Sequence, residues 1–140
     1  MRVLALDVGD RRIGVAVSDP TGVLATPLLA VERRDPASDV SDLLRLIEEH
    51  QASEIVVGFP RTLQGDVGLQ AGKVKRFVAL LSERTDVPIA TVDERLSTVQ
   101  AERMLAESPG RRSRDRGRVD AAAAAVILQS YLDSHGPPSR

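Results

Sequence analysis

Acidic side chains at three separate places in this sequence could carry chemistry. The first, Asp7, interrupts the apolar run 3–8, where a carboxylate costs several kcal/mol of desolvation unless a cation lies beside it. A salt bridge to Arg11 or Arg12 is the plain structural explanation for such a cation. Gly9 lies two residues further on and leaves space for a metal or a phosphate to approach the backbone. The position of Asp7 therefore predicts a cation next to it.

The second and third acidic places lie far along the chain. Asp93 and Glu94 follow the apolar run 88–92, at the end of an expected strand, where ligands gather in open α/β sheets. Successive strand residues point to opposite faces, so one of this pair can share the face of Asp7, although both could be solvated turn residues. Asp120 lies in the first turn of an expected helix, where the helix dipole by itself favours an acid.

Taken together, the three acidic places suit a hard divalent cation. Mg²⁺ takes oxygen ligands and typically relies on a few carboxylates plus substrate phosphate oxygens. The chain has no Cys and only two His, His50 and His135, so thiolate and imidazole metal sites are not expected. Two such ions about 4 Å apart can activate a water and stabilise the leaving oxygen of a phosphodiester. The acids therefore predict hydrolysis of a nucleic-acid backbone.

Basic residues form a second candidate feature. Residues 108–118 hold five arginines opposed by Asp115 alone, and the segment ends just before Asp120. A solvated surface is the usual explanation for such a run, but its place beside a candidate metal ligand favours contact with phosphates. Three further cations follow a polar loop at 61–68 that could equally be an ordinary surface connection. The predicted phosphate-binding residues are Arg111, Arg112, Arg114, Arg116 and Arg118, together with Lys73, Lys75 and Arg76.

Apolar patterning predicts the elements that must position these residues. Apolar runs bounded by turn signals indicate five strands, over residues 3–8, 13–17, 23–31, 55–58 and 88–92. Apolar residues at helical spacing indicate helices around 40–47, with Asp39 or Ser41 as the N-cap, and around 74–81. A capping box at Ser97 starts another helix that reaches about residue 107, and the last helix covers 119–132. This order predicts an α/β fold, a five-stranded mixed sheet with helices on both faces.

Length and composition narrow the possible classes of protein. The 140 residues, 42% of them hydrophobic, suit a single domain over residues 1–134 followed by a disordered tail at 135–140. The net charge of −1 excludes neither nucleic acid nor a small molecule as the partner. Aromatic residues make up 2% of the chain, so binding of nucleic acid should depend on backbone contacts. Neither a signal-peptide pattern nor an apolar run of about 18 residues occurs, so we expect a cytoplasmic protein without a membrane span.

Four blocks of the sequence resemble the YqgF family, which is also called RuvX. The blocks are LALDVG with RIGVA (4–16), IVVGFP (55–60), VDERLST (92–98) and GRVDAA (117–122). They occur in the family's order, and the resemblance spans the chain from Arg2 to about Leu132. Phe59 stands where a leucine is commoner in that family.

The resemblance implies an RNase H-like fold and Mg²⁺- or Mn²⁺-dependent cleavage of structured nucleic acid. Processing of the 5′ end of the 16S ribosomal RNA precursor is the leading role that it implies, and cleavage of four-way DNA junctions, as a Holliday junction resolvase, is the alternative. By position, Asp7 matches the metal ligand of the first strand, Glu94 the acid after the later strand, and Asp120 the acid that opens the last helix. Asp93 stays possible in place of Glu94.

Two other classes of protein share some of these features. Actin-like and sugar-kinase ATPases also begin with an aspartate, a spaced glycine and a hairpin, but they close two domains around the nucleotide, and this chain supplies one. A Walker-type phosphate loop is also absent from the sequence. A catalytically silent nucleic-acid-binding module of the same fold is the other alternative, and the intact acidic positions count against it. No base-reading pattern is visible, so structured RNA and branched DNA both stay open as substrates.

Overall fold

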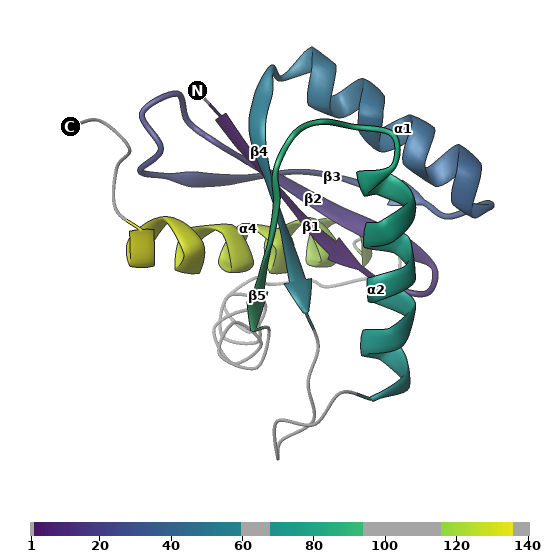
Figure 1. Cartoon of the computed structure of the whole chain (residues 1–140). Helices are drawn as coiled ribbons and strands as arrows, with labels where there is room; N and C mark the ends of the chain where they lie inside the picture. The colour runs from purple at the N-terminus through teal and green to yellow at the C-terminus, as the bar shows by residue number, and fades with distance from the viewer. Residues whose placement is uncertain (1, 60–67, 94–115, 136–140) are drawn as a thin grey trace.

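A computed structural model of the chain describes residues 2–59, 68–93 and 116–135 (Figure 1). Its strands form one five-stranded sheet in the order β3-β2-β1-β4-β5. Strand β2 runs antiparallel to both β1 and β3, whereas β4 is parallel to β1 and β5 is parallel to β4. The predicted five-stranded mixed sheet is therefore confirmed. The strands are β1 (Arg2–Val8), β2 (Arg12–Ser18), β3 (Ala25–Glu32), β4 (Ala52–Phe59) and β5 (Ile89–Asp93).

Helices cover both faces of this sheet, as predicted. Helices α1 (Pro36–Glu49) and α2 (Leu69–Ser82) pack on one face, and α4 (Arg116–His135) lies across the other face (Figure 1). We call these the α1/α2 face and the α4 face. The helix expected to start at Ser97 lies outside the described residues. Within the described part of the chain, no helix is long and apolar enough to cross a membrane.

Alternation along the central strand divides the core between the two faces. Leu4 and Leu6 of β1 belong to the apolar cluster of the α1/α2 face, whereas Ala5 between them belongs to the cluster of the α4 face. All three side chains are fully buried. The α4 face is built largely from small residues, such as Ala16 of β2 and Ala124 of α4, so this helix can lie close to the sheet.

Helix α1 begins earlier than its apolar spacing indicates. Its N-cap is Asp35, whose carboxylate accepts a hydrogen bond of 2.9 Å from the Ser38 backbone N–H, and Pro36 occupies the first turn. The prediction of Asp39 or Ser41 as the N-cap is therefore wrong. Asp39 is instead a buried side chain with 1% of its surface exposed.

Helix α4 is longer at both ends than the predicted range 119–132. It begins at Arg116, so Asp120 is its fifth residue and lies beyond the first turn, contrary to the prediction. A Cβ at Gly117 would lie 3.6 Å from Ala30 of β3, so a small residue lets this end of the helix pack close to the sheet. His135, expected in the disordered tail, ends the helix, and residues 136–140 lie outside the described part.

Candidate functional site

The site is centred on Asp7, near the carboxyl end of the central strand β1. Asp7 is paired with Gly14 of β2, and residues paired across strands point to the same face of a sheet. Alternation from Ala5, which belongs to the α4 cluster, puts the half-buried Asp7 side chain on the α4 face. Asp7 therefore points toward the helix that carries Asp120.

At Gly14 the backbone of α4 comes very close to the sheet. A Cβ at Gly14 would lie 2.0 Å from the backbone carbonyl oxygen of Asp120 and 2.4 Å from its carbonyl carbon. Both distances are far inside van der Waals contact, so only glycine allows this approach. Asp7 and Asp120 thus flank the same glycine, one from the neighbouring strand and one from the helix above it. The structure brings together two of the three predicted acidic places.

Arg12 holds the carboxylate of Asp120. Its Nε donates a hydrogen bond of 2.7 Å to Asp120 Oδ2, and its Nη1 lies 3.6 Å from Glu32 Oε2. The hydrogen bond to Asp120 is the main cause that raises the pKa of the Arg12 guanidinium. The side chains of Arg12 and Asp120 are only 19% and 29% exposed, which makes this pair better shielded from water than an ordinary surface salt bridge.

The sequence identified Arg12 only as a possible partner of Asp7, on the basis of its nearness in the hairpin. Its bond to Asp120 joins residues that are 108 positions apart in the chain. Arg12 and Gly14 are two residues apart on one strand and so share a face. Had α4 been assigned to the face of Gly14, that alternation would have indicated the contact.

Asp93 lies on the other face of the sheet. It is the last residue of β5 and is paired with Phe59 of β4, whose side chain belongs to the core of the α1/α2 face. Val92, the preceding residue, packs against the cluster of the α4 face. The pleat therefore directs Asp93 away from the face that carries Asp7. Glu94 lies outside the described residues.

The predicted basic residues divide between two regions. Arg118 is exposed on α4, two residues before Asp120, and Arg116 begins the same helix. Arg111, Arg112 and Arg114 lie outside the described residues. Lys73, Lys75 and Arg76 are exposed on α2. Lys73 Nζ lies 3.3 Å from Asp10 Oδ1, and so α2 is linked to the turn that follows Asp7.

The chemistry of these donors fits a hard divalent cation. Asp7 and Asp120 offer carboxylate oxygens around a residue without a side chain, and such oxygens are the ligands that Mg²⁺ and Mn²⁺ prefer. No group of three or more Asp, Glu, His or Cys able to hold a metal occurs within residues 2–59, 68–93 and 116–135. The described residues thus supply two acids of a candidate site.

A family model described as RuvX, Holliday junction resolvase, matches residues 1–134. The chain belongs to the RuvX family. A relative from Roseiflexus sp. (strain RS-1) is 48% identical over 133 residues, which cover 95% of this chain and 94% of the relative. A relative from Desulforamulus reducens is 46% identical over 134 residues, or 96% and 98% of the two chains. Both relatives carry the name "Putative pre-16S rRNA nuclease".

Solved structures confirm the RNase H-like fold of this RuvX chain. Thermus thermophilus RuvC in complex with a Holliday junction substrate superposes with a TM-score of 0.63 at 16% identity, over 98% of both chains. Fowlpox virus resolvase in complex with Holliday junction DNA gives a TM-score of 0.55 at 11% identity, over 96% of this chain and 99% of that one. The family match and the relatives confirm a nuclease, a hydrolase that acts on the phosphodiester bonds of nucleic acid.

Proposed function

We propose that this RuvX chain is a divalent-metal-dependent endonuclease of structured RNA that processes the 5′ end of the 16S ribosomal RNA precursor in the cytoplasm. Its proposed metal ligands are Asp7, Glu94 and Asp120. The observation that carries the proposal is the meeting of Asp7 and Asp120 around Gly14. Two carboxylates that lie close together repel each other, and a divalent cation bound between them would offset that repulsion.

The pleat of β5 supports the choice of Glu94 over Asp93 as the third ligand. Asp93 shares the face of Phe59 and the residue before it packs on the α4 face, so the Asp93 side chain points away from Asp7. An acid at the end of β5 would complete a set drawn from two strands and one helix. Such a set leaves coordination positions for water and for phosphate oxygens of the substrate.

The chain's own residues would position the metal ligands and bind the substrate backbone. Bound Mg²⁺ or Mn²⁺ would supply an activated water and charge stabilisation at the scissile phosphate. Asp7 lies on a strand at the centre of the sheet, so its carboxylate is held in place before substrate arrives. Arg12 fixes one oxygen of Asp120, and the contact at Gly14 fixes the backbone behind it. Arg118, near Asp120, and the arginines before it would bind the substrate backbone.

Precursor ribosomal RNA is the substrate that the relatives favour. Those at 46% and 48% identity match this chain along nearly their whole length, and their name states that role. The chain has few aromatic residues and several exposed cations, which suits recognition of a folded RNA by its backbone and shape. Cleavage of four-way DNA junctions is the second candidate, because the family description names it.

A cleavage assay with matched substrates tests the proposal. Purified chain is incubated with a 16S precursor carrying its 5′ extension, with a four-way DNA junction, and with linear duplexes of the same sequences. Each reaction is run with Mg²⁺, with Mn²⁺ and with EDTA, and Asp7→Asn serves as the control for contaminating nucleases. We expect metal-dependent cleavage near the mature 5′ end of the RNA.

Three other outcomes would contradict the proposal in different ways. Preferential cleavage of the junction would make the chain a resolvase. Binding without cleavage under every condition would make it a silent nucleic-acid-binding module. Equal cleavage in EDTA would remove the role of the metal, and with it the assignment of Asp7, Glu94 and Asp120.

A further inference from the structure

Arg33, just after the end of β3, contacts three separate parts of the fold: α1, α2 and the β1–β2 turn. Its Nε donates to Asp39 Oδ2 of α1 at 3.1 Å, and its Nη1 donates to the Gly9 carbonyl oxygen at 2.8 Å. Its backbone N–H donates to the Arg11 carbonyl oxygen at 2.9 Å. The guanidinium lies over the ring of Phe77 of α2, 5.2 Å from the centroid. One side chain thus joins the β1–β2 turn to both helices of the α1/α2 face.

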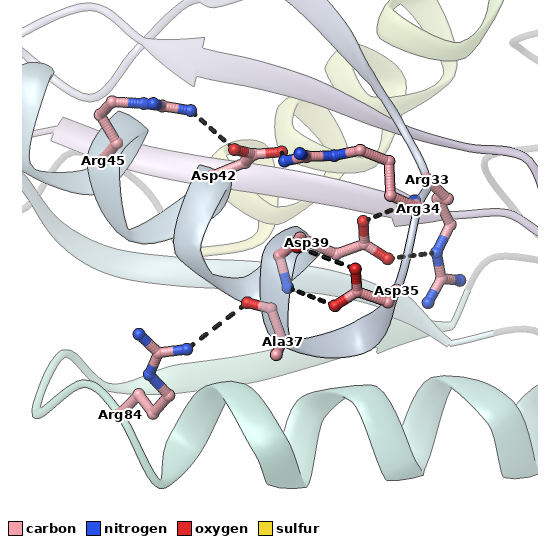
Figure 2. A network of polar contacts seen from close by, with 9 residues as sticks. Arg33, Arg34, Asp35, Ala37, Asp39, Asp42, Arg45 and Arg84 are labelled. Carbon is pink, nitrogen blue, oxygen red and sulfur yellow. Dashed lines mark hydrogen bonds and ion pairs between the residues drawn. The ribbon is translucent and has the colours of Figure 1, made fainter.

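Asp39 holds the Arg33 side chain in place through an ion pair (Figure 2). It is 1% exposed, and both of its carboxylate oxygens are used: Oδ2 by Arg33 and Oδ1 by the Arg34 backbone N–H at 3.0 Å. A carboxylate this deeply buried is costly unless it is paired and hydrogen-bonded. The pairing fixes the plane of the Arg33 guanidinium, and with it the direction of the Nη1 group that reaches Gly9.

The turn that Arg33 holds, residues 9–11, follows the candidate catalytic acid directly. Gly9 lies two residues after Asp7, and its N–H closes the turn on the Arg12 carbonyl oxygen at 2.9 Å. A Cβ at Gly9 would lie 2.9 Å from that same oxygen, so the turn is tight. Two of the turn's carbonyl groups, those of Gly9 and Arg11, accept hydrogen bonds from Arg33.

Asp7 lies where β1 is no longer paired with β4 and is paired with β2 alone. Pairing of β1 with β4 runs from Arg2 to Leu6, whereas pairing with β2 runs on to Val8. Asp7 thus lies just beyond the last β1–β4 pair, and its direction depends on the hairpin. A hairpin whose turn moved would carry Asp7 with it, and a displacement of about 1 Å in a catalytic group costs on the order of a hundredfold in rate.

We propose that Arg33, fixed by the buried Asp39, is a positioning residue that holds the 9–11 turn and thereby directs Asp7 toward Asp120. The proposal rests on the proposed function for the role of Asp7. Neither Arg33 nor Asp39 touches the acids themselves in these contacts. Their effect passes through the backbone of the hairpin.

The experiment compares Arg33→Gln, Arg33→Lys and the double variant Arg33→Gln with Asp39→Asn. The double variant leaves no buried carboxylate unpaired, so it keeps the test open if Arg33→Gln folds poorly. Asp42→Asn is the matched control. Asp42 also lies on α1, and its replacement breaks the ion pairs with Arg34 and Arg45 without reaching the turn. Three quantities are measured: amide hydrogen exchange by NMR, Mn²⁺ affinity without substrate, and kcat and KM for cleavage.

We expect both Arg33→Gln and the double variant to increase exchange of the Gly9 amide about tenfold or more, while the strand amides of Leu4 and Leu6 keep their protection. Mn²⁺ affinity should fall about tenfold and kcat about a hundredfold, with KM within about twofold of wild type. Arg33→Lys should behave similarly, because an ammonium cannot bridge Asp39 and Gly9 as the planar guanidinium does. Asp42→Asn should match wild type.

Two results would overturn the inference. Unchanged exchange of the Gly9 amide with unchanged Mn²⁺ affinity would show that the structure of the 9–11 turn does not depend on Arg33. Equal loss of protection in the turn and in the strand would make Arg33 a general stabiliser. A wild-type chain that neither binds Mn²⁺ nor cleaves nucleic acid would instead overturn the proposed function, and this inference with it; that failure is recognised because it occurs without any substitution.

Discussion

Gly14 and Asp120 lie in direct backbone contact, so close that a Cβ at Gly14 would lie 2.0 Å from the Asp120 carbonyl oxygen. The contact ties α4 to the central hairpin at the residue paired with Asp7. It therefore sets the distance between two candidate metal ligands that come from opposite ends of the chain.

Replacing Gly14 by alanine should separate the helix from the sheet. The atom in the way belongs to the backbone, so no side-chain rotation relieves the clash, and overpacking of this kind costs about 1–3 kcal/mol or more. We expect the free energy of unfolding in urea to fall by at least that amount and Mn²⁺ binding to weaken. Gly72→Ala is the control, since its Cβ would meet only the flexible end of Arg76, at 3.8 Å, inside helix α2. That variant should be neutral or stabilised by up to about 1 kcal/mol; equal stability of the two variants would contradict the contact.

Asp7→Asn should abolish metal-dependent cleavage and leave the fold intact. The amide keeps the shape of the side chain and removes the charge that would hold the cation. Removing one of several neighbouring carboxylates relieves their repulsion, so the stability of the metal-free chain should be unchanged or raised. Activity should fall by about a thousandfold or more, because metal-assisted attack contributes many kcal/mol and each tenfold is about 1.4 kcal/mol. Cleavage and thermal unfolding are the measurements, and wild-type cleavage by this variant would end the assignment.

Glu94→Gln should be far more harmful than Asp93→Asn. Asp93 shares the face of Phe59, away from Asp7, and Glu94 is the proposed ligand. We expect Glu94→Gln to lower cleavage by about a hundredfold or more and to weaken Mn²⁺ binding, with Asp93→Asn within a few fold of wild type. The reverse order of the two effects would make Asp93 the ligand.

The arginine-rich segment should contribute phosphate contacts that depend on salt. Replacing Arg111, Arg112, Arg114 and Arg116 by Gln should weaken binding to every structured RNA and DNA tested. The slope of log affinity against log salt should become shallower by roughly one unit for each lost contact. Arg45→Gln, on α1, removes one charge that is paired at 2.7 Å with a carboxylate of its own helix, so it should leave the slope unchanged. An unchanged slope in the fourfold variant would indicate an ordinary solvated segment.

Asp19 should make the β2–β3 turn sensitive to acid. Its carboxylate accepts hydrogen bonds from the Thr21 hydroxyl and from the backbone N–H groups of Leu24 and Val23, which lower its pKa from 3.8 to about 2. A carboxyl whose pKa is lower in the folded state stabilises the fold above its unfolded pKa and loses that contribution as the pH falls toward its folded pKa. Asp19→Ala should therefore lower the urea midpoint at pH 7, and its difference from wild type should shrink from about pH 4 downward. A difference that stays constant from pH 7 to pH 3 would contradict this.

Sequence patterns predicted the five strands, their arrangement in a mixed sheet, and the family. Strand and helix patterns depend on neighbours within a few residues, so the runs at 3–8 and 55–58 located β1 and β4, although β4 extends beyond its run to Ala52–Phe59. The N-cap of α1 also has a local sequence signal, the pair Asp35-Pro36. The prediction relied instead on the apolar spacing that begins at Val40 and therefore placed the N-cap too late in the chain. The expectation of Mg²⁺ or Mn²⁺ came from residue types, because the chain has carboxylates and no cysteine, and it stays a prediction.

Which of these residues contact one another depends on the tertiary structure. The Arg12–Asp120 bond, the burial of Asp39 beneath Arg33 and the start of α4 at Arg116 all depend on a helix or strand distant in the chain. Periodicity specifies which face of an element is apolar, but it does not specify which partner covers that face or how close the partner comes. At Gly14 the close approach is possible because glycine has no side chain. The sequence does not show that this space is used, because it is the backbone of the distant Asp120 that occupies it.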